Sequence, residues 1–111
     1  GICLHGHTHL PTVFKAKKTL DNTINVTLEI PKEGVPITLY PEDRYLCNPG
    51  AVGQPRDNDP RASFAILEYT SHEEAATFTV HRVEYDIETA QKKTHNAGLP
   101  IVLANRLSKG T

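Results

Sequence analysis

The sequence contains no tryptophan, no methionine and only two cysteines, Cys3 and Cys47. Two cysteines in apolar strand-like runs do not make a disulfide framework, and they favour buried free thiols in a reducing, cytoplasmic setting. There is no long apolar run, so the sequence predicts neither a membrane span nor a signal peptide. Lysine and arginine (12) nearly balance aspartate and glutamate (13), so charge offers nothing for binding DNA or an anionic membrane.

The length of 111 residues suits one domain or less, with a small core. The first residues, Gly1 to Cys3, enter an apolar run abruptly and include no initiator methionine. We therefore expect the chain to be part of something longer, or its beginning not to be represented.

Short apolar runs and alternating patterns predict five to seven strands. The expected strands cover residues 2–5, 13–16, 26–30, 35–39, 45–47, 64–67 and 76–85. The unbroken runs 2–5 and 64–67 are typical of strands buried on both faces. The alternating segments 26–30 and 35–39, joined by Pro31 to Gly34, predict a hairpin. A change of phase near residues 81–82 predicts a bulge in the last strand.

The carboxyl end is expected to be helical. Asp86 is a suitable N-cap for a helix over residues 87–96, which Gly98 ends. Pro100 suits the first turn of a second helix, ended by Gly110. Strands followed by helices predict a mixed α+β fold, with an antiparallel or mixed sheet and its helices at one end.

The segment Gly6-His7-Thr8-His9 follows the first predicted strand. Two imidazoles one residue apart suit Zn, Mn, Fe or Ni, and a turn at Gly6 would let His7 and His9 aim at different points. A pair of surface or capping histidines is an equal alternative, because this spacing alone is a weak signal. His5 is expected to be a buried strand-end residue rather than a ligand. The remaining histidines, expected to be structural or solvent-facing, are His72, His81 and His95.

A second segment is Asn48-Pro49-Gly50-Ala51-Val52-Gly53-Gln54-Pro55-Arg56-Asp57. Two glycines and two prolines impose a tight, non-repeating path, and loops of this kind commonly carry function. Backbone amides near Gly50 and Gly53 could face an anion, and Arg56 is a natural phosphate ligand. The alternative is an ordinary connector with a solvated Arg56, which these residues alone favour slightly.

Taken together, five segments match one family, namely residues 6–11, 48–57, 61–67, 82–86 and 97–100. They resemble the carboxyl-terminal part of calcineurin-like metallophosphoesterases, most closely the small bacterial and archaeal branch. The resemblance covers nearly the whole chain, apart from residues 22–44.

The resemblance implies the carboxyl-terminal half of a four-layer α/β/β/α sandwich, with residues 1–111 as one portion of a single domain. It implies a metal-dependent phosphoesterase, in which a dinuclear centre of Mn, Fe, Ni, Zn or Co activates hydroxide to attack a phosphomonoester or phosphodiester. His7 and His9 would bind different ions. Arg56 and Asn48 are the candidate contacts of the substrate phosphate.

The family's earlier ligand motifs do not occur in this chain. These are an Asp-x-His, a Gly-Asp with the bridging carboxylate, a Gly-Asn-His and a further His. Asp57 and Asp59 lie in the wrong motif, and Ala51 stands where many relatives have serine. We therefore assign no catalytic residue here, expect the amino-terminal half of the domain as partner, and expect the isolated chain to be inactive. The sequence leaves a homo-oligomer open.

Two alternatives belong to other functional classes. The chain could be a non-catalytic, β-rich domain that binds a metal or a partner through an exposed edge of the predicted hairpin 25–40. It could also be a mononuclear zinc hydrolase in which His5 or His81 joins His7 and His9, because catalytic zinc usually has three protein ligands.

Overall fold

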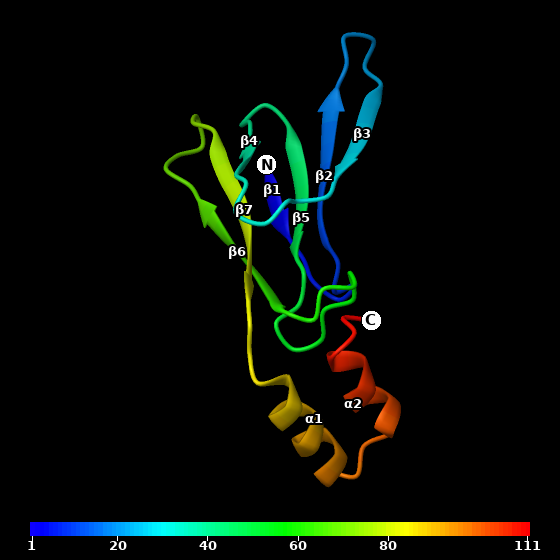
Figure 1. The fold of residues 1–111 in the computed structure, drawn as a ribbon. Coiled ribbons are helices and arrows are strands. Elements are labelled where there is room, and N and C mark those ends of the chain that lie inside the picture. Colours follow the sequence, from blue (N-terminus) through cyan, green and yellow to red (C-terminus); the bar gives the residue numbers. More distant parts are fainter.

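The computed structural model describes residues 1–111 as seven strands followed by two helices (Figure 1). The strands are β1 (Ile2–Leu4), β2 (Pro11–Lys18), β3 (Ile24–Glu29), β4 (Ile37–Leu39), β5 (Arg44–Pro49), β6 (Ala62–Glu68) and β7 (Ala76–Val83). The helices are α1 (Ile87–Asn96) and α2 (Ile101–Leu107). The predicted α+β class, with two helices after the strands, is confirmed.

The strands form two sheets that share one core. The larger sheet has the order β1-β5-β2-β3, and the smaller one has the order β4-β7-β6. The larger sheet contributes Val13, Tyr45 and Cys47 to the core, and the smaller contributes Ile37, Leu39, Ala76, Phe78 and Val80. Burying a side chain such as Phe78 contributes about 1.5–3 kcal/mol, so this inner layer is the main source of stability.

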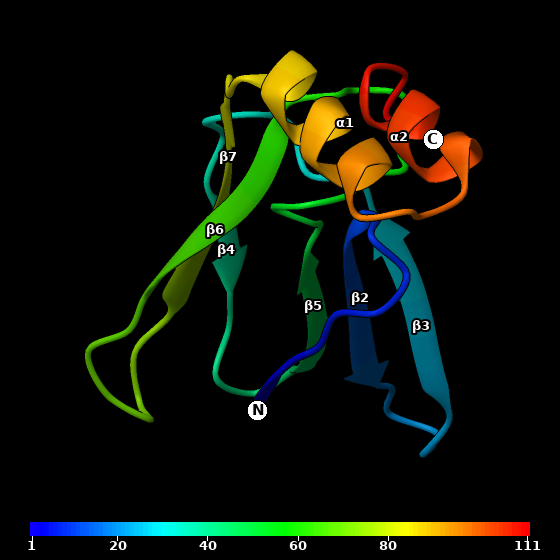
Figure 2. The ribbon, with the colours of Figure 1, turned by 90° about the horizontal axis from the view of Figure 1, so that it is seen from below.

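The direction of β1 decides where the candidate site lies. β1 runs parallel to β5, with Leu4 opposite Cys47, whereas the other strand pairs are antiparallel. The carboxyl ends of β1 and β5 therefore meet at one edge of the sheet. The histidine loop after β1 and the Gly/Pro-rich loop after β5 lie at this edge, and both helices lie at the same end of the molecule (Figures 1 and 2).

The predicted hairpin between residues 26–30 and 35–39 is wrong. β3 pairs with β2, with Leu28 opposite Phe14, while β4 pairs with β7 in the other sheet. The connection crosses between the sheets instead of turning back. Gly34 adopts a φ of 72° in this crossover, and its N–H donates to the carbonyl of Val80 at 2.8 Å. The alternating pattern thus identified two strands but not their partners.

Three smaller expectations are also wrong. β6 and β7 pair in continuous register from Ala62–Val83 to Glu68–Thr77, without a bulge. Neither run expected to be buried on both faces is so. In β1 the adjacent residues Cys3 and Leu4 are both exposed, and in β6 one face carries Phe64 and Ile66, which are 38% and 48% exposed. β1 and β6 are edge strands, each with a neighbour on one side only. Both cysteines are free, as expected. Cys47 is buried, whereas Cys3 is exposed, so the expectation of two buried thiols is wrong for Cys3.

The helix boundaries follow from local capping. The Asp86 carboxylate accepts the N–H of Thr89 at 2.9 Å, and Gly98 ends α1 with a φ of 73°. α2 begins one residue later than predicted, because Pro100 is its N-cap. Neither helix is long and apolar enough to cross a membrane.

Acid is expected to loosen α1 before it affects the core. Hydrogen bonds from Thr89 hold the pKa of the Asp86 carboxyl below its ordinary value. A lowered pKa means that the cap stabilises the helix above about pH 3.9, and that this contribution is lost as the pH falls through the folded pKa. Hydrogen exchange of the first-turn amides of α1 measures this loss. Asp86→Asn keeps a capping oxygen that does not titrate, so its first-turn amides should lose less protection on acidification than those of the wild type.

Candidate functional site

His7 and His9 both have a left-handed backbone conformation. Their φ angles are 74° and 62°, which residues other than glycine adopt infrequently. Such conformations cost about 1–3 kcal/mol each, persist where the surroundings enforce them, and cluster at functional sites. His7 is exposed, whereas His9 is half-buried. The contacts that enforce this loop therefore define the candidate site.

The imidazole of His9 is held in one tautomer. Its Nδ1 lies 2.7 Å from the backbone carbonyl oxygen of Gln54. A carbonyl only accepts, so Nδ1 donates the proton and Nε2 keeps a free lone pair. The main chain of His9 is held as well, because the N–H of Arg56 donates to its carbonyl at 3.3 Å. Metal-binding histidines are typically oriented by such a hydrogen bond from the other ring nitrogen.

Asn48 connects the histidine loop to the end of β5. Its side chain is 0% exposed, and its amide nitrogen donates to the carbonyl of Gly6 at 3.2 Å and to Thr8 Oγ1 at 2.8 Å. Its amide oxygen accepts the N–H of Gly50 at 2.9 Å. These protein contacts engage both polar atoms of the side chain, which favours a positioning role for Asn48.

Gly50 lies against β6 so closely that a side chain would not fit. Its φ is 87°, and an added Cβ would lie 2.7 Å from Ser63 Oγ. Ser63 itself is buried, donates its hydroxyl to the carbonyl of Pro49 at 2.6 Å, and donates its N–H to the carbonyl of Ala51 at 2.9 Å. The first half of the Gly/Pro-rich loop is thereby fastened to the smaller sheet.

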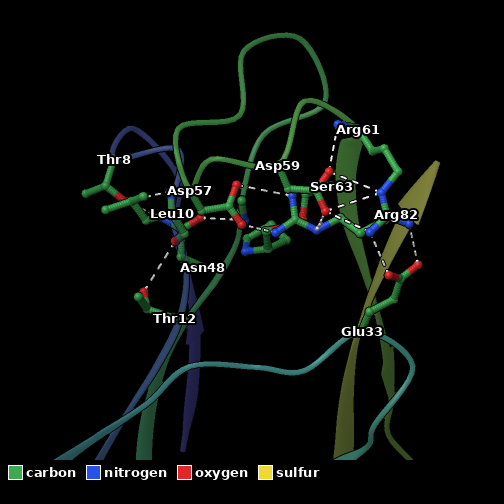
Figure 3. Close-up of polar contacts among 12 residues, drawn as sticks. Thr8, Leu10, Thr12, Glu33, Asn48, Asp57, Asp59, Arg61, Ser63 and Arg82 are labelled. Atoms are coloured by element: carbon green, nitrogen blue, oxygen red, sulfur yellow. Dashed lines mark hydrogen bonds and ion pairs between the residues drawn. The ribbon is translucent and has the colours of Figure 1, made fainter. Parts of the chain in front are cut away.

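An ionic network holds the second half of this loop (Figure 3). Arg82 of β7 has a side chain only 8% exposed and donates to both carboxylate oxygens of Asp57. Arg61 bridges Asp59 at 2.7 Å and Glu33 at 2.8 Å. The hydrogen bond from Arg61 keeps the pKa of the Asp59 carboxyl below its usual range. The two aspartates of the loop are thus ion-paired with arginines.

The sequence and fold are similar to a solved structure, the crystal structure of a metallophosphoesterase from Sphaerobacter thermophilus. The two share 40% identity with a TM-score of 0.70, and the match covers 99% of this chain and 42% of that chain. Nearly all of this chain is thus similar to part of a metallophosphoesterase. The expected resemblance to metallophosphoesterases and the expected partial metallophosphoesterase fold are therefore confirmed.

The sequence is also similar to the uncharacterized protein MJ0912 of Methanocaldococcus jannaschii. It is 37% identical over 105 residues, which are 95% of this chain and 37% of that protein. This chain therefore spans about two fifths of the length of the proteins it matches. No protein-family model matches the chain.

The other histidines of this chain do not complete a site with His7 and His9. No three His, Cys, Asp or Glu side chains form a group that could hold a metal ion. His5 directs Nδ1 to the Gly6 carbonyl at 3.1 Å, and its Nε2 is buried without a partner. His81 stacks on Phe64. The three-ligand zinc site with His5 or His81 is not formed by these residues.

Several residues of the site carry no signal in the sequence. The backbone carbonyl of Gln54 cannot be recognised from the sequence as the acceptor for His9, because every residue has a backbone carbonyl. Arg82 and Asp57 are 25 positions apart, so no local spacing joins them. Arg56 was identified from its chemistry, and it is exposed, with its guanidinium donating to the side chain of Gln54 at 3.2 Å.

Proposed function

We propose that this chain supplies the last metal-ligand motif of a metal-dependent phosphoesterase, with His7 and His9 binding two different divalent ions. The observation that carries the proposal is the geometry of His9. Its Nδ1 is bound to the Gln54 carbonyl, its Nε2 lone pair is free, and its backbone is held in an unusual conformation. The metallophosphoesterase from Sphaerobacter thermophilus supports the same reaction class.

The donor set of this loop fits such a centre in part. Neutral imidazole suits Mn, Fe, Ni, Zn or Co, and two such cations would supply charge neutralisation at a phosphoester and a water of lowered pKa. The chain's own residues orient the ligands, since Asn48 holds the histidine loop and Gln54 holds the ring of His9. The Cys47 thiol lies in the hydrophobic core, and burial raises its pKa to about 11.

Arg56 is our candidate for binding the substrate phosphate. It is exposed, and its backbone N–H contacts the carbonyl of His9. A guanidinium presents several donors in a fixed plane and binds phosphate with two of them. Asn48 was the second candidate, and its contacts with Thr8 and Gly50 support a role in positioning instead.

We further propose that residues 1–111 are the carboxyl-terminal portion of one domain, and that the remaining ligands, including a bridging carboxylate, come from its amino-terminal half. The outer face of the larger sheet supports this. Leu46 (39%), Phe14 (36%) and Leu28 (54%) form an exposed apolar row across β5, β2 and β3. A patch of this kind marks a surface that another element covers. Two free thiols support a reducing, cytoplasmic setting.

The test compares the intact protein with the isolated 111-residue chain. We expect the intact protein to hydrolyse p-nitrophenyl phosphate or its bis ester, to lose this activity on chelation and to regain it with Mn²⁺. The isolated chain should be inactive. Turnover that is insensitive to chelation would contradict the metal role. A monodisperse, folded and inactive intact protein would favour the non-catalytic binding domain.

A further inference from the structure

We propose that Asp57 and Arg82 are positioning residues for His9, acting through the loop segment 54–57. Neither side chain touches the imidazole. They fix the end of a short segment whose other end holds both the ring and the main chain of His9. The inference rests on the proposed function only where it concerns metal affinity.

Two hydrogen bonds join the segment 54–57 to His9. The Gln54 carbonyl accepts from the imidazole at 2.7 Å, and the Arg56 N–H donates to the His9 carbonyl at 3.3 Å. These two bonds fix the ring and the strained backbone together. Moving the segment away would leave the Nδ1 proton without its acceptor, and the common alternative tautomer, with the proton on Nε2, would become accessible.

The ion pair between Asp57 and Arg82 anchors the other end of the segment. Both terminal nitrogens of Arg82 donate to the Asp57 carboxylate, and the Arg82 side chain, on β7, is 8% exposed. Removing the Asp57 charge leaves the buried guanidinium of Arg82 with only the longer contact to Asp59, at 3.9 Å, which is costly for a buried charge. Pro55 lies between Gln54 and the Asp57–Arg82 ion pair; its side chain is fully buried and its ring fixes φ. A displacement at Asp57 is therefore transmitted to Gln54 instead of being absorbed locally.

Arg61 and Glu33 hold the loop at Asp59, and neither side chain hydrogen-bonds to residues 54–57. They are connected to the anchor only through the longer contact of Arg82 Nε with Asp59, at 3.9 Å. Their loss should loosen the loop without releasing His9. Glu33→Gln is thus a matched control, because it removes a carboxylate from the same network but leaves the anchor in place.

The experiment measures the ring nitrogens of His9 by ¹⁵N NMR in the intact, metal-free protein, at a pH where imidazole is neutral. The wild type should show a single tautomer with the proton on Nδ1. Asp57→Asn should show a mixture with the Nε2–H form, and Glu33→Gln should match the wild type. With Mn²⁺ as the probe, Asp57→Asn should raise the Kd about tenfold, the low end for loss of an outer partner. Glu33→Gln should leave it within about twofold.

An unchanged His9 tautomer in Asp57→Asn, or an equal shift in Glu33→Gln, would overturn the proposal. If Asp57→Asn does not fold, Arg82→Lys replaces it, since lysine keeps the charge but lacks the two-pronged geometry. That variant should shift the tautomer in the same direction, and an unchanged tautomer would count against the anchor. If the wild type binds no Mn²⁺, the proposed function fails, while the tautomer comparison still decides the role of Asp57 and Arg82.

Discussion

Replacing His9 by alanine is expected to lower kcat/KM of the intact protein for p-nitrophenyl phosphate by more than about 100-fold. Loss of an outer partner of a metal ligand already costs about 10- to 100-fold, so loss of the ligand itself should exceed this range. His7→Ala should have an effect of the same size, since we assign the two residues to different ions. The measurement is steady-state hydrolysis with saturating Mn²⁺, together with metal content, which should fall from about two ions per chain to about one.

His72→Ala is the matched control for these variants. His72 is exposed in the turn between β6 and β7, where its ring contacts Tyr69, and it should keep wild-type activity and metal content. A His9→Ala protein that retains activity to within about tenfold, with full metal content, would contradict the assignment of His9 as a ligand. A fall in activity with no change in metal content would point to a contact with substrate instead.

The second large effect is expected at Gly50, on stability rather than chemistry. Gly50→Ala would place a Cβ 2.7 Å from Ser63 Oγ and 3.0 Å from Pro11 Cγ, at a φ of 87°. The left-handed conformation costs about 1–2 kcal/mol for a residue with a side chain, and overpacking adds about 1–3 kcal/mol. We therefore expect the free energy of unfolding to fall by about 2–5 kcal/mol, as measured by denaturant unfolding of the intact protein.

Gly53→Ala provides the comparison within the same loop. No atom lies within 4 Å of a Cβ built at Gly53, and its backbone is not left-handed. Its free energy of unfolding should stay within about 0.5 kcal/mol of the wild type. If the two alanine variants were equally stable, the close approach of Gly50 to Ser63 would not be a constraint on the loop.

The parts of the fold that the sequence predicted well depend on neighbours in the chain. Asp86 caps α1 through Thr89, three positions away, and Gly98 ends the same helix. Interactions of this range leave a pattern in consecutive residues. The partner of a strand leaves none, which is why the alternating segments 26–30 and 35–39 predict a hairpin that does not form. The structure places them in different sheets.

The candidate site divides in the same way. The spacing of His7 and His9 within residues 6–9 is enough to suggest from the sequence that both are metal ligands. The sequence makes Asn48 a candidate contact of the substrate, because nothing nearby in the sequence indicates its hydrogen bond with Thr8, 40 positions away. The anchor between Asp57 and Arg82 was likewise hidden, although both residues belong to segments that resemble the family.

By itself, the sequence determined the fold class, the two helices, the resemblance to metallophosphoesterases and the choice of His7 and His9 as candidates, because each rests on composition, local spacing or matched segments. Only the tertiary structure decided the strand partners, the hydrogen bond at His9 Nδ1 and the contacts of Asn48, Asp57 and Arg82. The physical reason is that these depend on non-local contacts. A backbone carbonyl can hold a ring, and a buried ion pair can hold that carbonyl, only after the parallel pairing of β1 and β5 has brought two distant loops to one edge.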